Sequence, residues 1–275
     1  MDDVIRAREF KLVITPRFDR SWDFVGHGDT YNKERVPNIE TQSKSASTGL
    51  NAYVYTDTKQ QITINNHIAC AIKHEDIAQL LSRGNMKQEM QKKMGYSLAR
   101  KLDVDIAALA ASFSQNVGTL GVELTYDNLL RAAQYLEDAG VDMGGDDVAW
   151  FFSPAQRAGL LKMDTFIHGS YVGDSAARMA HEQATIGTFL GAPVVISPLI
   201  TSPASGQHDN FLAEKKIIAL IMAKSPSVST DRIALDLADV VVEDEIYGLS
   251  EVDTYSEALG NITATDEGAV WLKGV

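Results

Sequence analysis

The feature that most constrains the fold is a long stripe of apolar residues at helical spacing between Asp76 and Phe113. The stripe consists of Ile77, Leu80, Leu81, Met86, Met90, Met94, Leu98, Leu102, Ile106, Leu109 and Phe113. Residues three or four apart share one face of an α-helix, so we predict one long helix. Gly84 marks a position near which this helix could be interrupted. The 28 residues from Asn85 onward would span roughly 40 Å as a helix, which is long for a compact domain.

The same stripe argues against a coiled coil. Steps of four residues carry it around the helix, whereas a coiled coil keeps a straight heptad seam. We therefore predict a helix that lies across several different neighbours.

Two strand-like segments precede this helix and flank a polar stretch. They are VPNIE at 36–40 and LNAYVYTDTKQQITINNHIACAIK at 50–73, and the stretch between them, TQSKSASTG, is rich in Ser and Thr. In the second segment apolar residues occupy even positions, as in a half-buried strand: Ile62, Ile64, Ile68, Cys70 and Ile72. The pattern predicts a long hairpin with a polar tip.

Residues 1–35 mix charges with isolated aromatic residues and show neither helical nor strand periodicity. We predict an extended arm without regular structure. Its aromatic side chains, Phe10, Phe18, Trp22 and Phe24, should be buried against the protein's own core or against another chain.

After NVGTLGVE the sequence alternates between helix and strand patterns. Thr125 is the predicted cap and Gly140 the predicted end of a helix. VAWFF at 148–152 is predicted as a buried strand. Ser153 and Pro154 then predict the N-cap and first residue of another helix.

The stretch IGTFLGAPVVISPLI at 186–200 has two glycines, two prolines and no charge. Gly187 and Gly191 bracket a predicted hairpin-like bend. Pro193 should begin a strand where its missing N–H is tolerated, and Pro198 should end it. The stretch is thus predicted as sheet core, not as a ligand loop. KIIALIMAK is a further apolar segment downstream, and ADVVVEDEIYGL begins the closing section of the chain.

The candidate chemical motifs all fail on their spacing or their neighbours. His67, Cys70 and His74 have the short spacing of zinc ligands, but strand alternation puts His67 and Cys70 on opposite faces. HEQAT has Thr185 where the second His of a zincin helix would stand. There is no G-x-S-x-G elbow, and GTFLG lacks the further glycines or the Lys of nucleotide-binding loops.

The acidic stretch at 242–245 is predicted to be a solvated edge. No motif therefore predicts a catalytic, cofactor-binding or metal site.

The net charge of −12 argues against a nucleic-acid binder, which needs a basic surface. The charge is also unevenly spread. Residues 1–101 hold 16 Lys and Arg against 12 Asp and Glu, and residues 102–275 hold 9 against 25, which gives +4 and −16. The first third of one copy should therefore be attracted to the body of another copy.

The beginning of the chain and its cysteine content bear on location. Cys70 is the only cysteine, so no internal disulfide can form and a reducing compartment suffices. MDDVIRAREF lacks the features of a signal peptide, and no uncharged apolar run approaches the length of a membrane span. A soluble, unexported protein is expected.

An arm, a long hairpin, a long helix, an α/β region and a returning strand, in this order, resemble the major capsid protein of tailed bacteriophages, the Hong Kong 97-type fold. The resemblance runs from about Gly28 to Gly248. SLARKLDVDIAALAA at 97–111 is similar to the end of the family's spine helix. NLLRAAQYLEDAGVDMGGDDVAWFFSPAQRAGLL and ATIGTFLGAPVVISPLI, with Ser197 before the turn, resemble two further segments of the family.

The resemblance implies an α+β fold in four parts. They are an N-terminal arm at 1–22, an extended loop (E-loop hairpin) at 23–72, a peripheral domain with the spine helix at 73–122 and 236–275, and an axial domain at 123–235.

The function implied is assembly into pentamers and hexamers that close into an icosahedral head around double-stranded DNA, without sequence-specific DNA binding. Implied partners are further copies of the chain and scaffolding, portal and decoration proteins, with no membrane. The implied location is the virion, assembled in the host cytoplasm. The resemblance implies a structural protein and not an enzyme, so no catalytic residue, cofactor or metal carries over. The Lys and Asn that cross-link some members cannot be matched here.

Two other classes of protein remain open. The same fold builds encapsulins, bacterial shells that enclose cargo enzymes; a cargo-peptide groove and a shell free of DNA would mark one. A cytosolic α/β enzyme with an unrecognised motif would be marked by a soluble, active monomer.

Overall fold

The computed structural model describes residues 12–18, 28–35, 41–50, 52, 58–76, 86–144, 147–167, 187–201, 207–252, 254–255, 264–265 and 268–274. The helices are α2 (Met86–Ala108), α3 (Tyr126–Asp138), α4 (Pro154–Leu160) and α5 (Asp164–Ile167), and the 3₁₀ turns are η1 (Thr15–Arg17), η2 (Leu109–Ser112) and η3 (Ala234–Asp236). The strands are β1 (Thr30–Arg35), β2 (Thr58–Thr63), β3 (Asn66–Glu75), β4 (Gln115–Gly118), β5 (Val148–Phe152), β6 (Thr188–Phe189), β7 (Ala192–Ile196), β8 (His208–Glu214), β9 (Ile218–Ile233), β10 (Ala238–Glu251), β11 (Thr254–Tyr255), β12 (Ala264–Thr265) and β13 (Ala269–Gly274).

The body of the molecule is built on a six-stranded sheet in the order β4-β13-β8-β5-β7-β6. β13 runs parallel to β4 and β5 parallel to β7, and the other neighbours are antiparallel. All five residues of β5 are buried, and successive side chains of a strand point to opposite faces. Trp150 packs with side chains of α3 and α4, while Phe151 packs with those of α2 and residues 14–18. The sheet is therefore covered on both faces, as the predicted buried strand requires.

The local helix signals are confirmed. The Thr125 side chain accepts a hydrogen bond of 3.3 Å from the backbone N–H of Asn128 at the start of α3. Beyond the end of α3, Gly140 has a φ of 83°. Ser153 caps α4, and Pro154 is the first residue of that helix.

The described part of the predicted sheet-core stretch, residues 187–200, forms β6, a tight turn and β7, so the predicted bend and strand are confirmed. Leu190 and Gly191 have φ values of 49° and 85°, the left-handed conformations that a two-residue hairpin turn demands. β7 lies inside the sheet between β5 and the short edge strand β6. Pro193 faces Thr188 of that edge strand.

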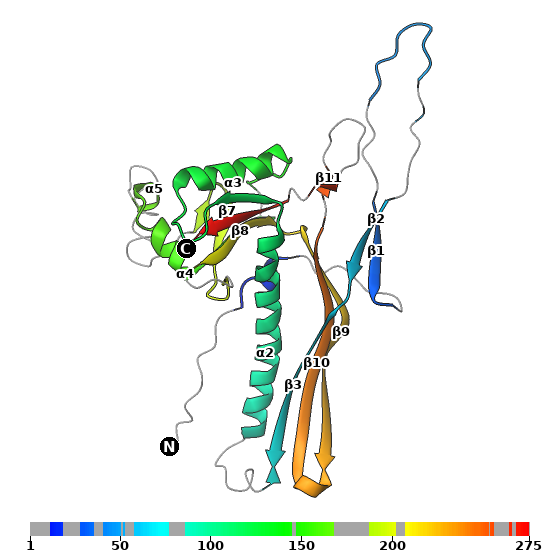
Figure 1. The fold of residues 1–275 in the computed structure, drawn as a ribbon, viewed down its shortest axis with the longest axis vertical. Coiled ribbons are helices and arrows are strands. Elements are labelled where there is room, and N and C mark those ends of the chain that lie inside the picture. Colours follow the sequence, from blue (N-terminus) through cyan, green and yellow to red (C-terminus); the bar gives the residue numbers. More distant parts are fainter. Residues whose placement is uncertain are drawn as a thin grey trace.

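A second sheet, which we call the ribbon, consists of β3, β10 and β9 in this order. All its neighbours are antiparallel, and it runs beside α2 away from the body (Figure 1). In β3 the odd-numbered residues are exposed and the even-numbered ones are covered, so the predicted alternation is confirmed. The register of β9 slips opposite Glu245, where Ser225 and Pro226 form a bulge, a position at which a strand tolerates proline.

The prediction that residues 242–245 form a solvated edge is wrong. They lie in β10, the central strand of the ribbon, and only 3% of Glu245 is exposed. A run of acidic residues normally indicates exposure to solvent. Here β3 and β9 flank β10 on both sides, and α2 packs over it, so its side chains are shielded. A single sequence does not show such a non-local neighbour.

The hairpin also differs from its prediction. β1 falls within residues 1–35, for which no regular structure is predicted, because its sequence TYNKER has no apolar alternation. The segment predicted as one strand at 50–73 is two strands in its described part, since β2 pairs with β1 and β3 pairs with β10. The segment at 36–40 lies outside the described residues.

The long helix is confirmed over its described part, where α2 and η2 together cover residues 86–112; residues 77–85 lie outside. Met94, Leu98, Leu102 and Ile106 are all buried. As predicted, α2 contacts several neighbours, namely β3, β10 and η1. None of the helices in the described part of the chain is long and apolar enough to cross a membrane.

Residues 12–18 of the predicted arm are fastened to α2 by one carboxylate. Asp103 has no exposed surface and accepts hydrogen bonds from the backbone N–H groups of Val13 at 3.1 Å, Ile14 at 3.3 Å and Thr15 at 2.9 Å. It also accepts one from the Thr15 hydroxyl. Hydrogen bonding to several donors is what makes a fully buried carboxylate tolerable.

The arm's aromatic side chain at Phe18 is buried against the protein's own core. It is 4% exposed and stacks on Phe151, with ring centroids 5.4 Å apart. The prediction of buried arm aromatics is thus confirmed for Phe18, whereas Phe10, Trp22 and Phe24 lie outside the described residues.

Replacing Gly191 by Val should destabilise the fold by about 3 kcal/mol, because valine is strained at positive φ and overpacks the site. A Cβ there would lie 2.9 Å from the Met143 carbonyl oxygen and 3.0 Å from Gly144 Cα. The urea unfolding midpoint measures the effect. Gly187→Val is the matched control, since a Cβ at Gly187 meets nothing within 4 Å. Equal midpoints for Gly191→Val and the wild type would contradict the account.

Candidate assembly surfaces

The candidate zinc ligands do not converge. The exposed His67 places its Nε2 3.1 Å from Asp244 Oδ2, while Cys70 and His74 lie on the opposite face of β3, as the alternation predicts. Among the described residues no group of three or more His, Cys, Asp or Glu side chains could hold a metal. The segment HEQAT lies outside the described residues. Ser197, in the Gly- and Pro-rich stretch, is buried, and its hydroxyl oxygen accepts the backbone N–H of Leu199.

Asp244 is the centre of a cross-strand cluster on the outer face of the ribbon. It accepts hydrogen bonds from Lys224 at 2.6 Å and from Ser227 at 2.9 Å, and it also contacts His67. These contacts lower the pKa of Asp244 to about 2, and the hydrogen bond from Lys224 has the largest effect. Its ordinary value is 3.8, so any stabilisation from the charged form is complete above that value and is lost as the pH falls through about 2. The cluster joins the three strands of the ribbon.

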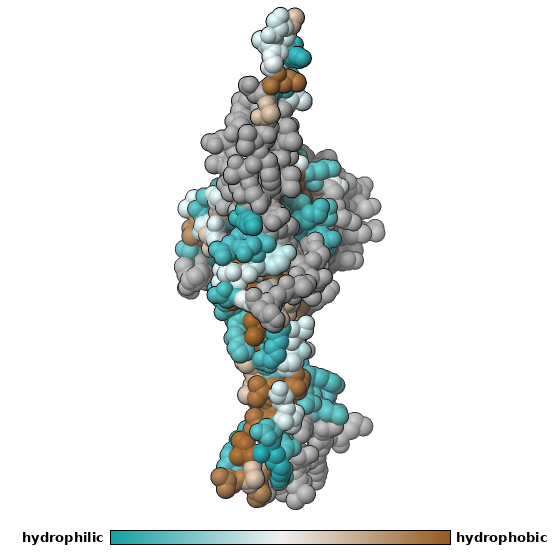
Figure 2. Space-filling model, turned by 90° about the vertical axis from the view of Figure 1, so that its right-hand side faces the viewer, coloured by the Kyte–Doolittle hydropathy of each residue, from teal (hydrophilic) through white to brown (hydrophobic). Residues whose placement is uncertain are grey.

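The far end of the ribbon exposes four apolar side chains, which we call the apolar tip. They are Val228, Ile233, Leu235 and Leu237, with exposed fractions of 59%, 37%, 97% and 62%. In Figure 2 hydrophobic surface gathers at this lower end of the molecule. A soluble protein seldom gathers large apolar side chains on one exposed projection unless something covers them.

Ion pairs hold the apolar tip in shape. Arg232 contacts Asp76 at 2.6 Å and Asp239 at 3.2 Å, and Lys73 contacts Asp236 at 2.5 Å. The Arg232 hydrogen bond lowers the pKa of Asp76, and the Asp236 hydrogen bond raises the pKa of Lys73. Such exposed pairs add little stability individually. Their geometric effect is to join β3, β9, β10 and η3 at the end of the ribbon.

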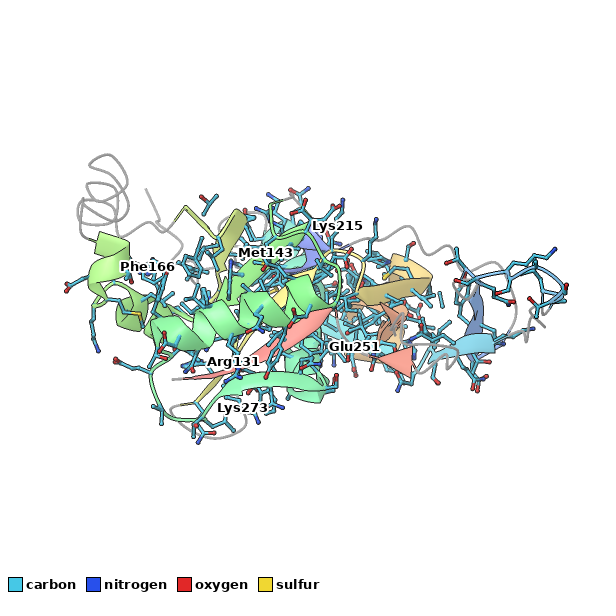
Figure 3. The ribbon with its side chains drawn as sticks, turned by 90° about the horizontal axis from the view of Figure 1, so that it is seen from above. Arg131, Met143, Phe166, Lys215, Glu251 and Lys273 are labelled. Carbon is cyan, nitrogen blue, oxygen red and sulfur yellow. The ribbon has the colours of Figure 1, made fainter. Side chains whose placement is uncertain are left out.

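The second projection is the hairpin, formed by β1, β2 and the loop that carries residues 41–50. β1 pairs with β2 from Thr30 opposite Thr63 to Arg35 opposite Thr58. Every residue from 41 to 50 is exposed. Figures 1 and 3 show the hairpin extending away from the sheet and from α3. A two-stranded hairpin without a core is marginal in water, so this loop needs an external support to be fixed.

The hairpin is anchored at its root. Ile62 is 1% exposed and packs with Ala219 and Ile221 of β9. The Gln60 side chain donates to the Glu251 carbonyl at 2.8 Å. Gly248 permits the close crossing, because a Cβ there would lie 2.8 Å from the Thr63 carbonyl oxygen.

Sequence reasoning missed the apolar tip and the role of Asp103. One signal for the tip was present: in DRIALDLADV two leucines stand between aspartates, a pattern of a turn whose apolar residues do not continue a core strand. For Asp103 no local signal exists, since its partners are some ninety positions away in the sequence.

No protein-family model and no curated protein matches the chain. Solved structures do match it over nearly its whole length. A chain from Mycobacterium phage Che8 has a TM-score of 0.79 at 16% identity, covering 99% of this chain and 94% of that one. The capsid structure of the cyanophage P-SCSP1u gives 0.78 at 15% identity, with 100% and 91% covered. The mature capsid of bacteriophage PhiM1 gives 0.74 at 12% identity, with 99% and 90% covered.

The chain has the tailed-phage capsid fold. The predicted α+β fold of Hong Kong 97 type is thereby confirmed. α2 takes the place of the predicted long helix, and the hairpin takes the place of the predicted long hairpin.

Replacing Val228 and Leu235 together by Ser should leave the free energy of unfolding within about 0.5 kcal/mol, because both side chains are exposed. Self-association should be lost, because the apolar tip then has less apolar area to bury. Urea unfolding and sedimentation velocity measure the two effects. Ser229→Ala, an exposed polar position on the same strand, is the control and should associate normally. Normal association of the double variant would show that the tip is not a contact surface.

Proposed function

We propose that this chain is the major capsid protein of a tailed phage. Copies would assemble into pentamers and hexamers that close into an icosahedral head around double-stranded DNA. The observation that carries the proposal is the capsid fold over 99% of the chain, in a molecule with two projections that one copy leaves uncovered.

The physical argument is one of burial. The body closes its own core on both faces of the six-stranded sheet, whereas the hairpin loop and the apolar tip have no core of their own. Contact with neighbouring copies would fix the loop, which opposes association through lost conformational entropy, and would remove the apolar tip from water, which favours it. A shell repeats such a contact for every subunit.

Charge supports the same arrangement. Residues 1–101 carry +4 and residues 102–275 carry −16, so the first third of one copy would be attracted to the body of the next. A net charge of −12 also suits a container for DNA, because it keeps binding of the packaged DNA weak and independent of sequence.

The proposal includes the four-part division into an arm at 1–22, an extended loop at 23–72, a peripheral domain at 73–122 and 236–275, and an axial domain at 123–235. The boundary at 235 falls between β9 and β10, which pair in one ribbon. The ribbon would therefore couple movements of the peripheral and axial domains.

The proposal also covers partners and location. We expect scaffolding, portal and decoration proteins as partners, with the virion as the final location after assembly in the host cytoplasm. An encapsulin shell or an α/β enzyme is not favoured, because the solved structures that match this chain over nearly its whole length include phage capsids.

Deleting residues 41–49 tests the proposal. Because all these residues are exposed, the variant should unfold at the wild-type urea midpoint. Shell formation should be abolished, because the loop can no longer reach a neighbour, and electron microscopy of the purified protein measures this. Thr48→Ala, which removes one hydroxyl bond to the Ser45 carbonyl and keeps the loop length, is the control. Wild-type shells from the deletion variant would refute the role of the hairpin.

A further inference from the structure

A cavity of about 500 Å³ lies between α2, the ribbon and residues 12–16. Its walls are mostly apolar and include Leu98 and Leu102 of α2 and Leu220 and Met222 of β9. A water molecule takes up about 30 Å³ in the liquid, so the space is large enough for an organic group. Neither the hairpin nor the apolar tip lines this cavity.

Two carboxylates of β10 line one side of the cavity. Glu243 and Glu245 are two residues apart and therefore share a face of the strand. Glu245 is 97% buried, since only 3% is exposed, and its Oε1 has no hydrogen-bond partner. Glu243 lies under the helix, where a Cβ on Gly95 would be 3.7 Å from Glu243 Oε1. Burial, with the nearby charge of Glu243, raises the pKa of Glu245.

The other polar groups at this interface do not neutralise these carboxylates. Asp103, which also lines the cavity, is acidic and already accepts the backbone of residues 13–15. Cys70 of β3 faces the same side, and its pKa is raised by burial and by Glu243 and Glu245. None of the described residues that line the cavity is basic. Among the described lining residues, the acidic pair therefore has no counter-charge.

We propose that this cavity binds a primary alkylammonium group, a chain of methylene carbons that ends in –NH₃⁺. The methylene chain would lie along Leu98, Leu102 and Met222. The ammonium group would donate its hydrogen bonds to Glu243 and Glu245 and satisfy the free Oε1. Burying a carboxylate is tolerated when it is paired in this way.

The geometry favours an ammonium ion over other cations. Residues two apart on a strand are about 7 Å apart along it, so a compact charge fits between the two carboxylates. A guanidinium group instead pairs best with a single carboxylate, to which it donates two parallel hydrogen bonds. A metal ion would need further ligands, and no suitable group of three occurs among the described side chains.

Two sources can supply this group: the lysine side chain of a neighbouring copy, or a free diamine. Both present the same chemistry to the cavity. The test therefore begins with dissociated subunits, where no neighbour is bound, and uses 1,5-diaminopentane as the probe. Sodium chloride at matched ionic strength and 1-pentanol serve as controls for charge and for the apolar chain.

Isothermal titration calorimetry of dissociated subunits should show saturable binding of one diamine per subunit, and no comparable binding of 1-pentanol. Glu245→Gln should weaken binding at least tenfold. Glu75→Gln, which changes an exposed Glu of β3, should bind as the wild type does. Ala99→Leu fills part of the cavity from α2 and leaves both carboxylates unchanged. It should also weaken diamine binding, and it tests the proposal if Glu245→Gln does not fold.

Assembled wild-type shells then distinguish the two sources. Shells that exclude the diamine indicate that a neighbour's lysine occupies the cavity, and shells that bind it indicate a site for free diamines. Absence of saturable binding to the subunits, or wild-type binding by both cavity variants, overturns the proposal. The subunit measurement needs no shell, so its failure is separate from failure of the proposed capsid function.

Discussion

The packing of α2 is the interaction on which the rest of the structure depends. Ile106 is fully buried against the body, Asp103 holds the backbone of residues 13–15, and the Tyr247 hydroxyl donates to Asp105 at 2.6 Å. The same helix therefore joins the arm, the sheet and the ribbon. Burial and the bond to Asp105 raise the pKa of Tyr247, so the phenol stays protonated and keeps donating.

This central helix explains why the molecule has projections. One part of α2 packs against the body, and β3 and β10 extend along the rest of the helix. The ribbon thus reaches beyond the core, and its end exposes Leu235 almost completely. The hairpin leaves from the same ribbon, at the crossing that Gly248 permits. Under the proposed function, contact with other copies would bury the apolar surface that remains exposed.

The sequence predicts those parts of the fold that depend on local periodicity and caps. The stripe through Met94 and Ile106, the cap at Thr125 and the strand VAWFF all have such signals, and the structure confirms each. The order of the elements was enough to indicate the capsid fold. Features that depend on distant partners were not predictable. β1 has a charged sequence, yet it is a strand because it pairs with β2. Glu245 lies in an acidic run that indicates exposure, yet the ribbon and α2 bury it. The cavity and the apolar tip depend on the same non-local packing.

The central claim is that one copy is incomplete and that many copies close into a shell. Negative-stain electron microscopy of the purified full-length protein tests it most directly. The account predicts closed shells, or rings of five and six subunits. A uniform population of 30.0 kDa monomers, at concentrations where phage capsid proteins assemble, would contradict it.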